Sequence, residues 1–253
     1  MIEALDHIVI LVDDLAAATA DYAQLGFKVV PGGTHTDGAT HNALVSFADG
    51  SYLELLAFLR PAENHGWWRH TAAGEGLIDF ALLPGAIGED VSNARERGLA
   101  IKGPFDGGRA RPDGVELKWQ TARAERQELP FLCGDVTPRE LRVPGEDTWT
   151  HPNGVRGIAG VTVAVHDLEA SARAYAALLG RLPVVEPGRR RFELRATQII
   201  LRTPASNEPD DSALEAHLQT RGEGIYGLQF QVIPKRSGAL LDLRQSHGVR
   251  ATV

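Results

Sequence analysis

Cysteine and an excess of basic charge are the two things that this sequence most clearly lacks. Its 253 residues include a single cysteine, Cys133, which excludes an internal disulfide and a cluster of thiolate metal ligands. Lys and Arg number 26 against 33 Asp and Glu, and the net charge of −7 gives no general attraction to nucleic acid or to anionic membranes. We therefore expect a small-molecule ligand, with no nucleic-acid or membrane partner.

Targeting segments and several familiar catalytic motifs are also missing. No apolar run reaches membrane-spanning length, and the N-terminus has neither the basic start nor the apolar stretch of a signal peptide. The sequence has no phosphate-cradling glycine loop followed by Lys-Ser or Lys-Thr, and no Gly-x-Ser-x-Gly nucleophile elbow. Together with the lone cysteine, these absences predict a cytoplasmic protein.

The sequence does contain an internal repeat. In both 5–26 and 158–180, a β-branched run is followed by an acidic cap and by an amphipathic helix that ends near glycine. Tyr22 and Tyr175 occupy the same place in the two copies, at an offset of 153 residues that the Asp-Leu pair before each helix shares. Unrelated segments would not keep one offset, so we interpret the two as copies of one unit.

Predicted strands follow each helix, which makes the repeating unit β-α-β-β-β. Four such units are predicted, and their ranges are 4–58, 76–137, 157–204 and a shortened 224–253 that includes a helix near 240–245. The first two units form a predicted domain over 1–140, and the last two form a degenerate second domain over 155–253. The turn-rich segment 139–155 is interpreted as the connector between them.

Alternation in the strands of the first unit points to a polar site. His7 alternates with Ile8 and Ile10, so if those two pack beneath the helix, His7 points to the opposite face. The same alternation puts Tyr52 and Glu54 on that face. A histidine and a carboxylate in apolar strands are costly to bury unless they are paired, hydrogen-bonded or bound to metal. This predicts a site on the concave side of the sheet.

Five short segments of the first unit carry a family resemblance. They are Leu5-Asp6-His7-Ile8-Val9, Asp14-Leu15, Pro31-Gly32-Gly33-Thr34-His35, Thr40-His41-Asn42-Ala43-Leu44 and Tyr52-Leu53-Glu54-Leu55. Together they resemble the glyoxalase-like branch of the vicinal oxygen chelate superfamily, which includes glyoxalases, extradiol dioxygenases and bleomycin-resistance proteins. The resemblance implies an α+β fold, in which repeated βαβββ units form curved, half-open mixed sheets with helices on the outer face.

The resemblance also implies a divalent metal with His7 and Glu54 as ligands. Imidazole and carboxylate suit Fe, Mn, Zn, Ni or Co. The other units supply no matching pair, because the 153-residue offset puts Gly160 at the His7 position and the last strand of the second unit offers only Cys133 and Asp135. Two ligands could hold a metal weakly with waters, could contact an organic ligand, or could be a hydrogen-bonded structural pair. These interpretations stay open.

Further pocket candidates come from the same motifs and from the tryptophans. His35 and Asn42 fit the glyoxalase-like pattern, and Trp119 could form an aromatic wall with Trp67 and Trp68, although tryptophans more often serve as core. The predicted ligand pocket therefore consists of His7, His35, Asn42, Tyr52, Glu54 and Trp119.

Two arginines and two glutamines are weaker candidates. Arg109 and Arg111 lie just before a predicted strand, where they could meet an anionic substrate, but a surface loop is the favoured interpretation. Gln229 and Gln231 alternate with apolar residues and suggest a polar inner face in the second half.

Two functions are compatible with the resemblance. One is a divalent-metal-dependent lyase, isomerase or dioxygenase, in which the metal acts as a Lewis acid on adjacent oxygens of a small oxygenated metabolite. The other is a metal-independent protein that sequesters a drug or metabolite, and the missing second ligand pair favours it. A degenerate second half that serves as scaffold or forms a homodimer contact is compatible with both.

Overall fold

The computed structural model describes residues 1–204, 210–232 and 246–252 of the chain. Its elements, in chain order, are β1 (Ala4–Leu11), α1 (Leu15–Gln24), β2 (Val30–His35), β3 (Thr40–Ser46), β4 (Tyr52–Phe58), the 3₁₀ turn η1 (Trp68–Ala73), β5 (Gly76–Leu83), α2 (Ile87–Glu96), β6 (Ile101–Ala110), β7 (Glu116–Ala124), β8 (Phe131–Asp135), α3 (Arg139–Arg142), the 3₁₀ turn η2 (Glu146–Thr148), β9 (Val155–Ala164), α4 (Leu168–Leu179), β10 (Val184–Glu186), β11 (Arg189–Glu193), β12 (Gln198–Arg202), α5 (Asp211–Arg221), β13 (Gly224–Val232) and β14 (Ala251–Thr252). No helix in the described part of the chain is long and apolar enough to cross a bilayer.

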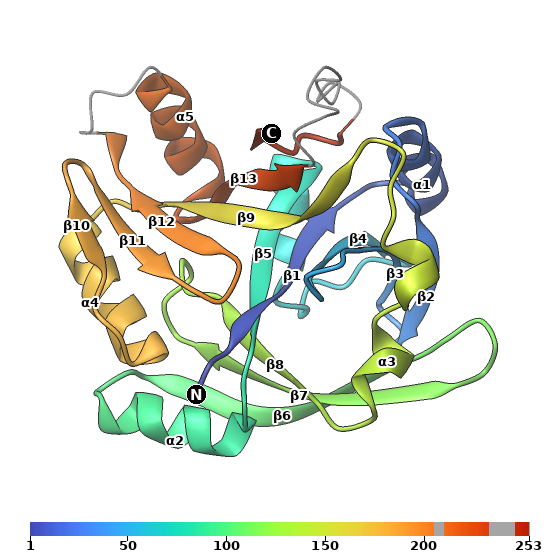
Figure 1. Ribbon diagram of the computed structural model, residues 1–253, viewed down its shortest axis with the longest axis horizontal. Coiled ribbons are helices and arrows are strands. Elements are labelled where there is room, and N and C mark those ends of the chain that lie inside the picture. Colours follow the sequence, from blue (N-terminus) through green and yellow to red (C-terminus); the bar gives the residue numbers. More distant parts are fainter. Residues whose placement is uncertain (205–209, 233–245, 253) are drawn as a thin grey trace.

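The order of these elements repeats the βαβββ unit. β1 to β4 with α1, β5 to β8 with α2, and β9 to β12 with α4 each follow that order. β13 and β14 belong to the predicted fourth unit, whose predicted helix at 240–245 lies outside the described residues. The α+β class and its curved sheets are therefore confirmed (Figure 1).

The first two units close further than the half-open sheet that we predicted. Their strands form a closed barrel in the order β1-β4-β3-β2-β6-β7-β8-β5, in which β5 pairs with β1. Closure depends on β6, because its far end pairs with β2 through Thr34 with Ala110 and His35 with Arg109. The remaining strands form an open six-stranded sheet in the order β10-β11-β12-β9-β13-β14.

The acidic caps of the repeat form as the sequence predicts. Asp14 accepts hydrogen bonds from the backbone N–H groups of Ala16 and Ala17 at 2.8 and 3.0 Å, and so begins α1. Asp167 accepts one from Ala170 at 2.9 Å and begins α4 in the same way. These side chains satisfy N–H groups that have no partner within the helix.

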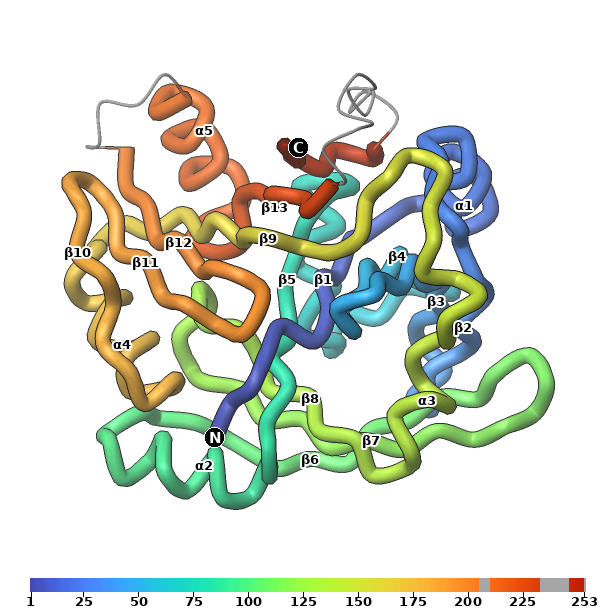
Figure 2. Tube along the Cα trace, in the orientation of Figure 1, coloured from blue at the N-terminus to red at the C-terminus, as the bar shows by residue number. Residues whose placement is uncertain are grey.

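The repeated tyrosines join the two halves of the chain. Tyr22 of α1 donates its hydroxyl to the Ser246 carbonyl at 3.2 Å, and Tyr175 of α4 donates to the Glu128 carbonyl at 2.6 Å. One continuous hydrophobic core contains residues from both predicted domains. Figure 2 shows the chain passing from α3 to β9, which brings the second sheet beside β1 and β5. The barrel is thus supported from outside, and its interior is left for a site.

Candidate metal and ligand site

A cavity of about 280 Å³ lies within the barrel. Residues of β1, β2, β3, β4, β6, β7 and β8 line it. All of the predicted pocket residues are among them, namely His7, His35, Asn42, Tyr52, Glu54 and Trp119. Six side chains separated by up to 112 positions in the sequence therefore face one space, since 119 − 7 is 112.

Strand alternation is what turns His7 and Glu54 inward. Ile8 and Ile10 pack in the large core outside the barrel, whereas Val9 belongs to a separate apolar cluster inside it. β1 and β4 run parallel, with His7 opposite Tyr52 and Val9 opposite Glu54. The His7 and Tyr52 rings stack with their centroids 4.7 Å apart, which fixes the plane of the imidazole.

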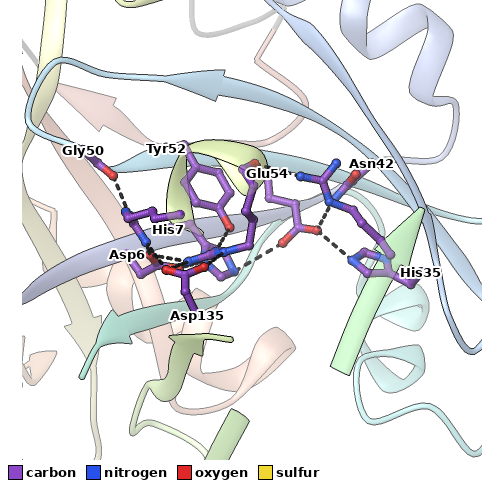
Figure 3. A network of polar contacts seen from close by, with 11 residues as sticks. Asp6, His7, His35, Asn42, Gly50, Tyr52, Glu54 and Asp135 are labelled. Atoms are coloured by element: carbon purple, nitrogen blue, oxygen red, sulfur yellow. Dashed lines mark hydrogen bonds and ion pairs between the residues drawn. The ribbon is translucent and has the colours of Figure 1, made fainter. Parts of the chain in front are cut away.

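Asp6, His7 and Glu54 form a buried polar chain, which Figure 3 shows. His7 Nδ1 lies 2.7 Å from Asp6 Oδ2, and His7 Nε2 lies 3.3 Å from Glu54 Oε2. All three side chains are at most 5% exposed. Each ring nitrogen of His7 therefore faces one carboxylate, and the Nε2 side faces the cavity.

Burial and neighbouring charges shift the pKa values of His7 and Glu54 in opposite directions. Burial disfavours the imidazolium, but the hydrogen bonds and charges of Asp6 and Glu54 outweigh it and raise the pKa of His7. Burial alone would likewise raise the pKa of Glu54, yet His7, with help from His35 and Asn42, lowers it to about 2. Both shifts favour the state in which His7 and Glu54 are a charged pair that shares one proton.

His35 and Asn42 approach the other oxygen of Glu54. Asn42 Nδ2 donates to Glu54 Oε1 at 2.6 Å, and His35 Nε2 lies 3.5 Å from the same oxygen. Thr40 Oγ1 holds His35 Nδ1 at 2.8 Å. Burial outweighs the attraction of Glu54 and lowers the pKa of His35, so its ring is neutral at pH 7. In Figure 3, Glu54 lies between the two histidines.

Arg139 and Arg142 of the short helix α3 hold Asp6 in place, and we did not predict either of them. Arg142 donates to Asp6 at 2.9 and 3.1 Å and to Asp135 at 2.5 and 3.0 Å, and it also donates to the Tyr52 hydroxyl at 2.6 Å. Arg139 donates to Asp6 at 2.5 Å. Burial alone would raise the pKa of Asp6, but Arg142, His7 and Arg139 together hold it well below its usual range.

Arg109 corrects a second sequence interpretation. It lies on β6 with 3% of its surface exposed and lines the cavity, so it is not on a surface loop. The reason is the register of β6, which places Arg109 opposite His35 of β2 on one side and Leu117 of β7 on the other. Arg111 behaves as predicted, since it is half-buried and pairs with Asp113 at 2.6 Å.

The aromatic wall is only partly as predicted. Trp67 and Trp119 line the cavity together with Phe131. Trp68 instead packs against Phe58, with ring centroids 4.8 Å apart. Gln229 and Gln231 are both exposed on β13 and do not line this cavity.

The positions that correspond to His7 and Glu54 in the other units do not supply a second pair of metal ligands. β9 and β12 pair in the same parallel register as β1 and β4, so that Gly160 and Ile200 occupy the places of His7 and Glu54. In the second unit, Asp79 is the fourth residue of β5, as His7 is of β1. Its carboxylate already accepts hydrogen bonds from Trp67 at 2.8 Å and Arg123 at 2.6 Å.

The donor set nevertheless fits a divalent transition metal. His7, His35 and Glu54 supply two imidazoles and one carboxylate, which are ligand types that such ions prefer. The Asp6 contact to His7 Nδ1 is the outer hydrogen bond that typically orients a metal-ligating histidine. Donor atoms of Asp6, His7 and Cys133 also lie within 4.8 Å of one another, but both Asp6 oxygens are held by arginines.

Comparison with known proteins places this geometry in a family. Residues 5–179 match a family model described as a glyoxalase-like domain, whereas no protein with a curated description matches the chain. A hypothetical protein from Staphylococcus aureus is similar, with a TM-score of 0.65 and 16% identity over 78% of this chain and 85% of that one. A mutant of 4-hydroxymandelate synthase from Streptomyces coelicolor has a TM-score of 0.62 and 15% identity, over 91% of this chain and 71% of that one. A xylose isomerase-like TIM barrel/4-hydroxyphenylpyruvate dioxygenase fusion protein has a TM-score of 0.54 and 16% identity, over 91% of this chain and 36% of that one.

Proposed function

This chain belongs to the glyoxalase-like domain family of the vicinal oxygen chelate superfamily, and on that premise we propose that it is a divalent-metal-dependent enzyme acting on a small oxygenated molecule in the barrel cavity. The observation that carries the proposal is the oriented pair of His7 and Glu54, whose Nε2 and Oε2 atoms lie 3.3 Å apart at the cavity wall. That separation suits two ligands of one ion, which are about 3 Å apart when each metal bond is about 2.1 Å long.

In this proposal, His7, Glu54 and His35 hold the metal. A bound divalent ion would supply Lewis-acid stabilisation to adjacent oxygens of the substrate. Two imidazoles and one carboxylate also form the donor set of non-haem iron oxygenases, which favours a dioxygenase over a lyase or an isomerase. The names of two structural neighbours, a 4-hydroxymandelate synthase and a 4-hydroxyphenylpyruvate dioxygenase fusion, are compatible with that preference.

The other residues of the site position these ligands. Asp6 holds Nδ1 of His7, and Arg142 holds Asp6, so these two residues set the direction of Nε2. The proton shared by His7 and Glu54 must leave before both can bind a metal, because ligands bind in their deprotonated forms. Metal affinity should therefore weaken as the pH falls.

A metal-independent binding protein is the second candidate. This candidate is favoured because both carboxylate oxygens of Glu54 have polar partners without a metal: His7 contacts one and Asn42 donates to the other. In that case the same cavity would hold an organic ligand through hydrogen bonds and its aromatic walls.

Metal content separates the two candidates. The protein should be purified without chelator, reconstituted with Fe(II), Mn(II), Zn(II), Ni(II) or Co(II), freed of excess metal and analysed for its elements. We expect close to one equivalent in the parent, and its loss in His7→Ala and in Glu54→Gln while circular dichroism shows an intact fold. His41→Ala is the matched control, because His41 is half-buried on β3 and does not line the cavity.

Either of two results would overturn the metal proposal. One is a parent protein that retains no metal after reconstitution, which would favour the binding protein. The other is a metal that stays bound in both cavity variants, which would place it elsewhere in the chain.

A further inference from the structure

Arg109 is a buried cation that faces the cavity without a carboxylate partner. Its side chain donates one hydrogen bond, from Nη2 to the carbonyl of Arg142 at 2.9 Å. Among the residues that the structure describes, no acid forms an ion pair with it. A guanidinium carries five N–H donors, and burying an unpaired charge is costly. The remaining donors of Arg109 are therefore available to a ligand in the cavity.

The other charges around the cavity are already matched. Glu54 pairs with His7, and Arg142 is neutralised by Asp6 and Asp135. The remaining acids of the lining, which are Asp37 and Asp106, are exposed at its rim. Among the described residues, Arg109 is thus the interior charge of this cavity that forms no ion pair, since Glu54, which attracts it, is paired with His7 instead.

Asn42 gives a second and independent indication of a ligand. The side chain is 5% exposed and lines the same cavity, and its Oδ1 is buried without a hydrogen-bond partner. Its Nδ2 is fixed by the bond to Glu54, which sets the direction of Oδ1. A buried acceptor without a partner loses the free energy of hydration with no replacement, and a ligand donor would restore it.

We propose that Arg109 binds the carboxylate of a small monocarboxylic acid, and that Asn42 Oδ1 accepts a hydrogen bond from the same molecule. Arginine suits this task because its planar fork can bind both carboxylate oxygens. Trp67, Trp119 and Phe131 line the space beside it and would enclose an apolar, preferably aromatic, body. The inference deepens the proposed function and rests on it, in that it assumes the same cavity holds the substrate.

The position of Arg109 relative to the proposed metal ligands supports this assignment. Arg109 on β6 is the direct pairing neighbour of His35 on β2. A carboxylate held by Arg109 therefore lies next to the His35 and Glu54 end of the site. The acid group would anchor the substrate, and atoms close to that group would face the proposed metal.

Benzoate and benzamide provide a matched test, since they share a ring and differ in charge. Binding of each should be measured by isothermal titration calorimetry, with metal-free and with metal-loaded protein. We expect the parent to bind benzoate roughly 10- to 100-fold more tightly than benzamide, the range that a hydrogen-bonded charged group typically contributes. Arg109→Gln should remove this preference by weakening benzoate binding far more than benzamide binding.

Two further variants keep the test decisive. Arg111→Gln is the matched control, because Arg111 lies two positions away, pairs with Asp113 and does not line the barrel cavity; it should keep the preference. Arg109→Lys retains the charge and loses the fork, and it should keep part of the preference. If Arg109→Gln does not fold, the ratio of benzoate affinity to benzamide affinity, measured with the parent and with Arg109→Lys, still tests the inference.

The outcomes separate this inference from the proposed function. Equal affinity for the two probes, or no benzoate binding in the millimolar range, overturns the carboxylate site, even if His7 and Glu54 bind metal. An Arg109-dependent preference in a protein that takes up no metal supports the carboxylate site and refutes the metal enzyme. Benzoate preference that survives Arg109→Gln also overturns the inference.

Discussion

Replacing Arg142 with methionine tests how the site is held in place. Arg142 is 3% exposed, and its guanidinium bridges Asp6, Asp135 and the Tyr52 hydroxyl. Methionine keeps an apolar, unbranched stem but has no charge, so the variant leaves Asp6 buried with Arg139 and His7 as its remaining partners. Breaking a buried pair on one side typically costs 3–5 kcal/mol. Because Arg139 remains, we expect about 3 kcal/mol, at the lower end of that range.

The pH dependence of this loss has a defined sign. Because the pKa of Asp6 is lower in the folded protein than in the unfolded chain, its stabilisation is present above its unfolded pKa, at about pH 4, and is lost as the pH falls further. Without Arg142, the folded pKa of Asp6 should be higher than in the parent, because only Arg139 and His7 then oppose the effect of burial. The stability difference between parent and variant should therefore narrow as the pH falls from 7 towards 4.

Urea unfolding followed by far-UV circular dichroism measures this difference at each pH. Arg139→Met is the comparison, because Arg139 is 27% exposed and its loss leaves Arg142 on Asp6; we expect about 1 kcal/mol. Adding Asp6→Asn to Arg142→Met should restore part of the stability, since it removes a buried charge that has lost its main partner. A change below about 0.5 kcal/mol in Arg142→Met at pH 7, the range of ordinary surface substitutions, would refute the reasoning.

Three further predictions concern Glu54, Gly32 and Tyr175. In metal-free protein, Glu54 has a pKa of about 2, so the stabilisation that its charged form gives is present above its unfolded pKa and is lost as the pH falls towards 2. Glu54→Gln should therefore flatten the acid limb of a plot of melting temperature against pH over that range. Gly32→Ala would place a methyl group 2.0 Å from Asn42 Oδ1, and calorimetry should show both a lower melting temperature and weaker ligand binding; unchanged values would contradict the packing described. Tyr175→Phe removes the 2.6 Å hydrogen bond to the Glu128 carbonyl and should lower the free energy of unfolding by about 1–3 kcal/mol, whereas no change would mean that this bond does not join the halves.

The first unit could be predicted from sequence because its signals are local. Asp14 precedes a helix with apolar spacing, and His7 and Glu54 alternate with apolar residues that must face a core. A period of two along a strand is enough to assign each side chain to a face. The prediction that His7 and Glu54 share a face therefore needed no knowledge of the barrel.

β6 could not be predicted in the same way. Its sequence, IKGPFDGGRA, contains three glycines and a proline and lacks alternation, so it reads as a loop. In the structure, β7 on one side and β2 on the other supply its hydrogen bonds. Because this strand was missed, Arg109 was placed on the surface; the half-open sheet that the resemblance implied is closed by the pairing of β6 with β2.

Arg142 was missed for a different reason. It lies in a four-residue helix within a segment interpreted as a connector, and its partner Asp6 is 136 positions away. Local patterns carry no information about such a pairing. A buried role for a connector arginine follows only from the tertiary fold.

X-ray absorption at the metal edge, recorded on the reconstituted protein, tests most directly the central claim that His7, Glu54 and His35 hold a divalent metal. We predict nitrogen and oxygen donors at about 2.0–2.2 Å with imidazole scattering, a spectrum unchanged in Cys133→Ser and lost in His7→Ala. A sulfur donor at about 2.3 Å would assign the site to Cys133 and contradict the proposed ligand set. A spectrum of fully hydrated ion, with no imidazole scattering, would show that the pair of His7 and Glu54 binds no metal.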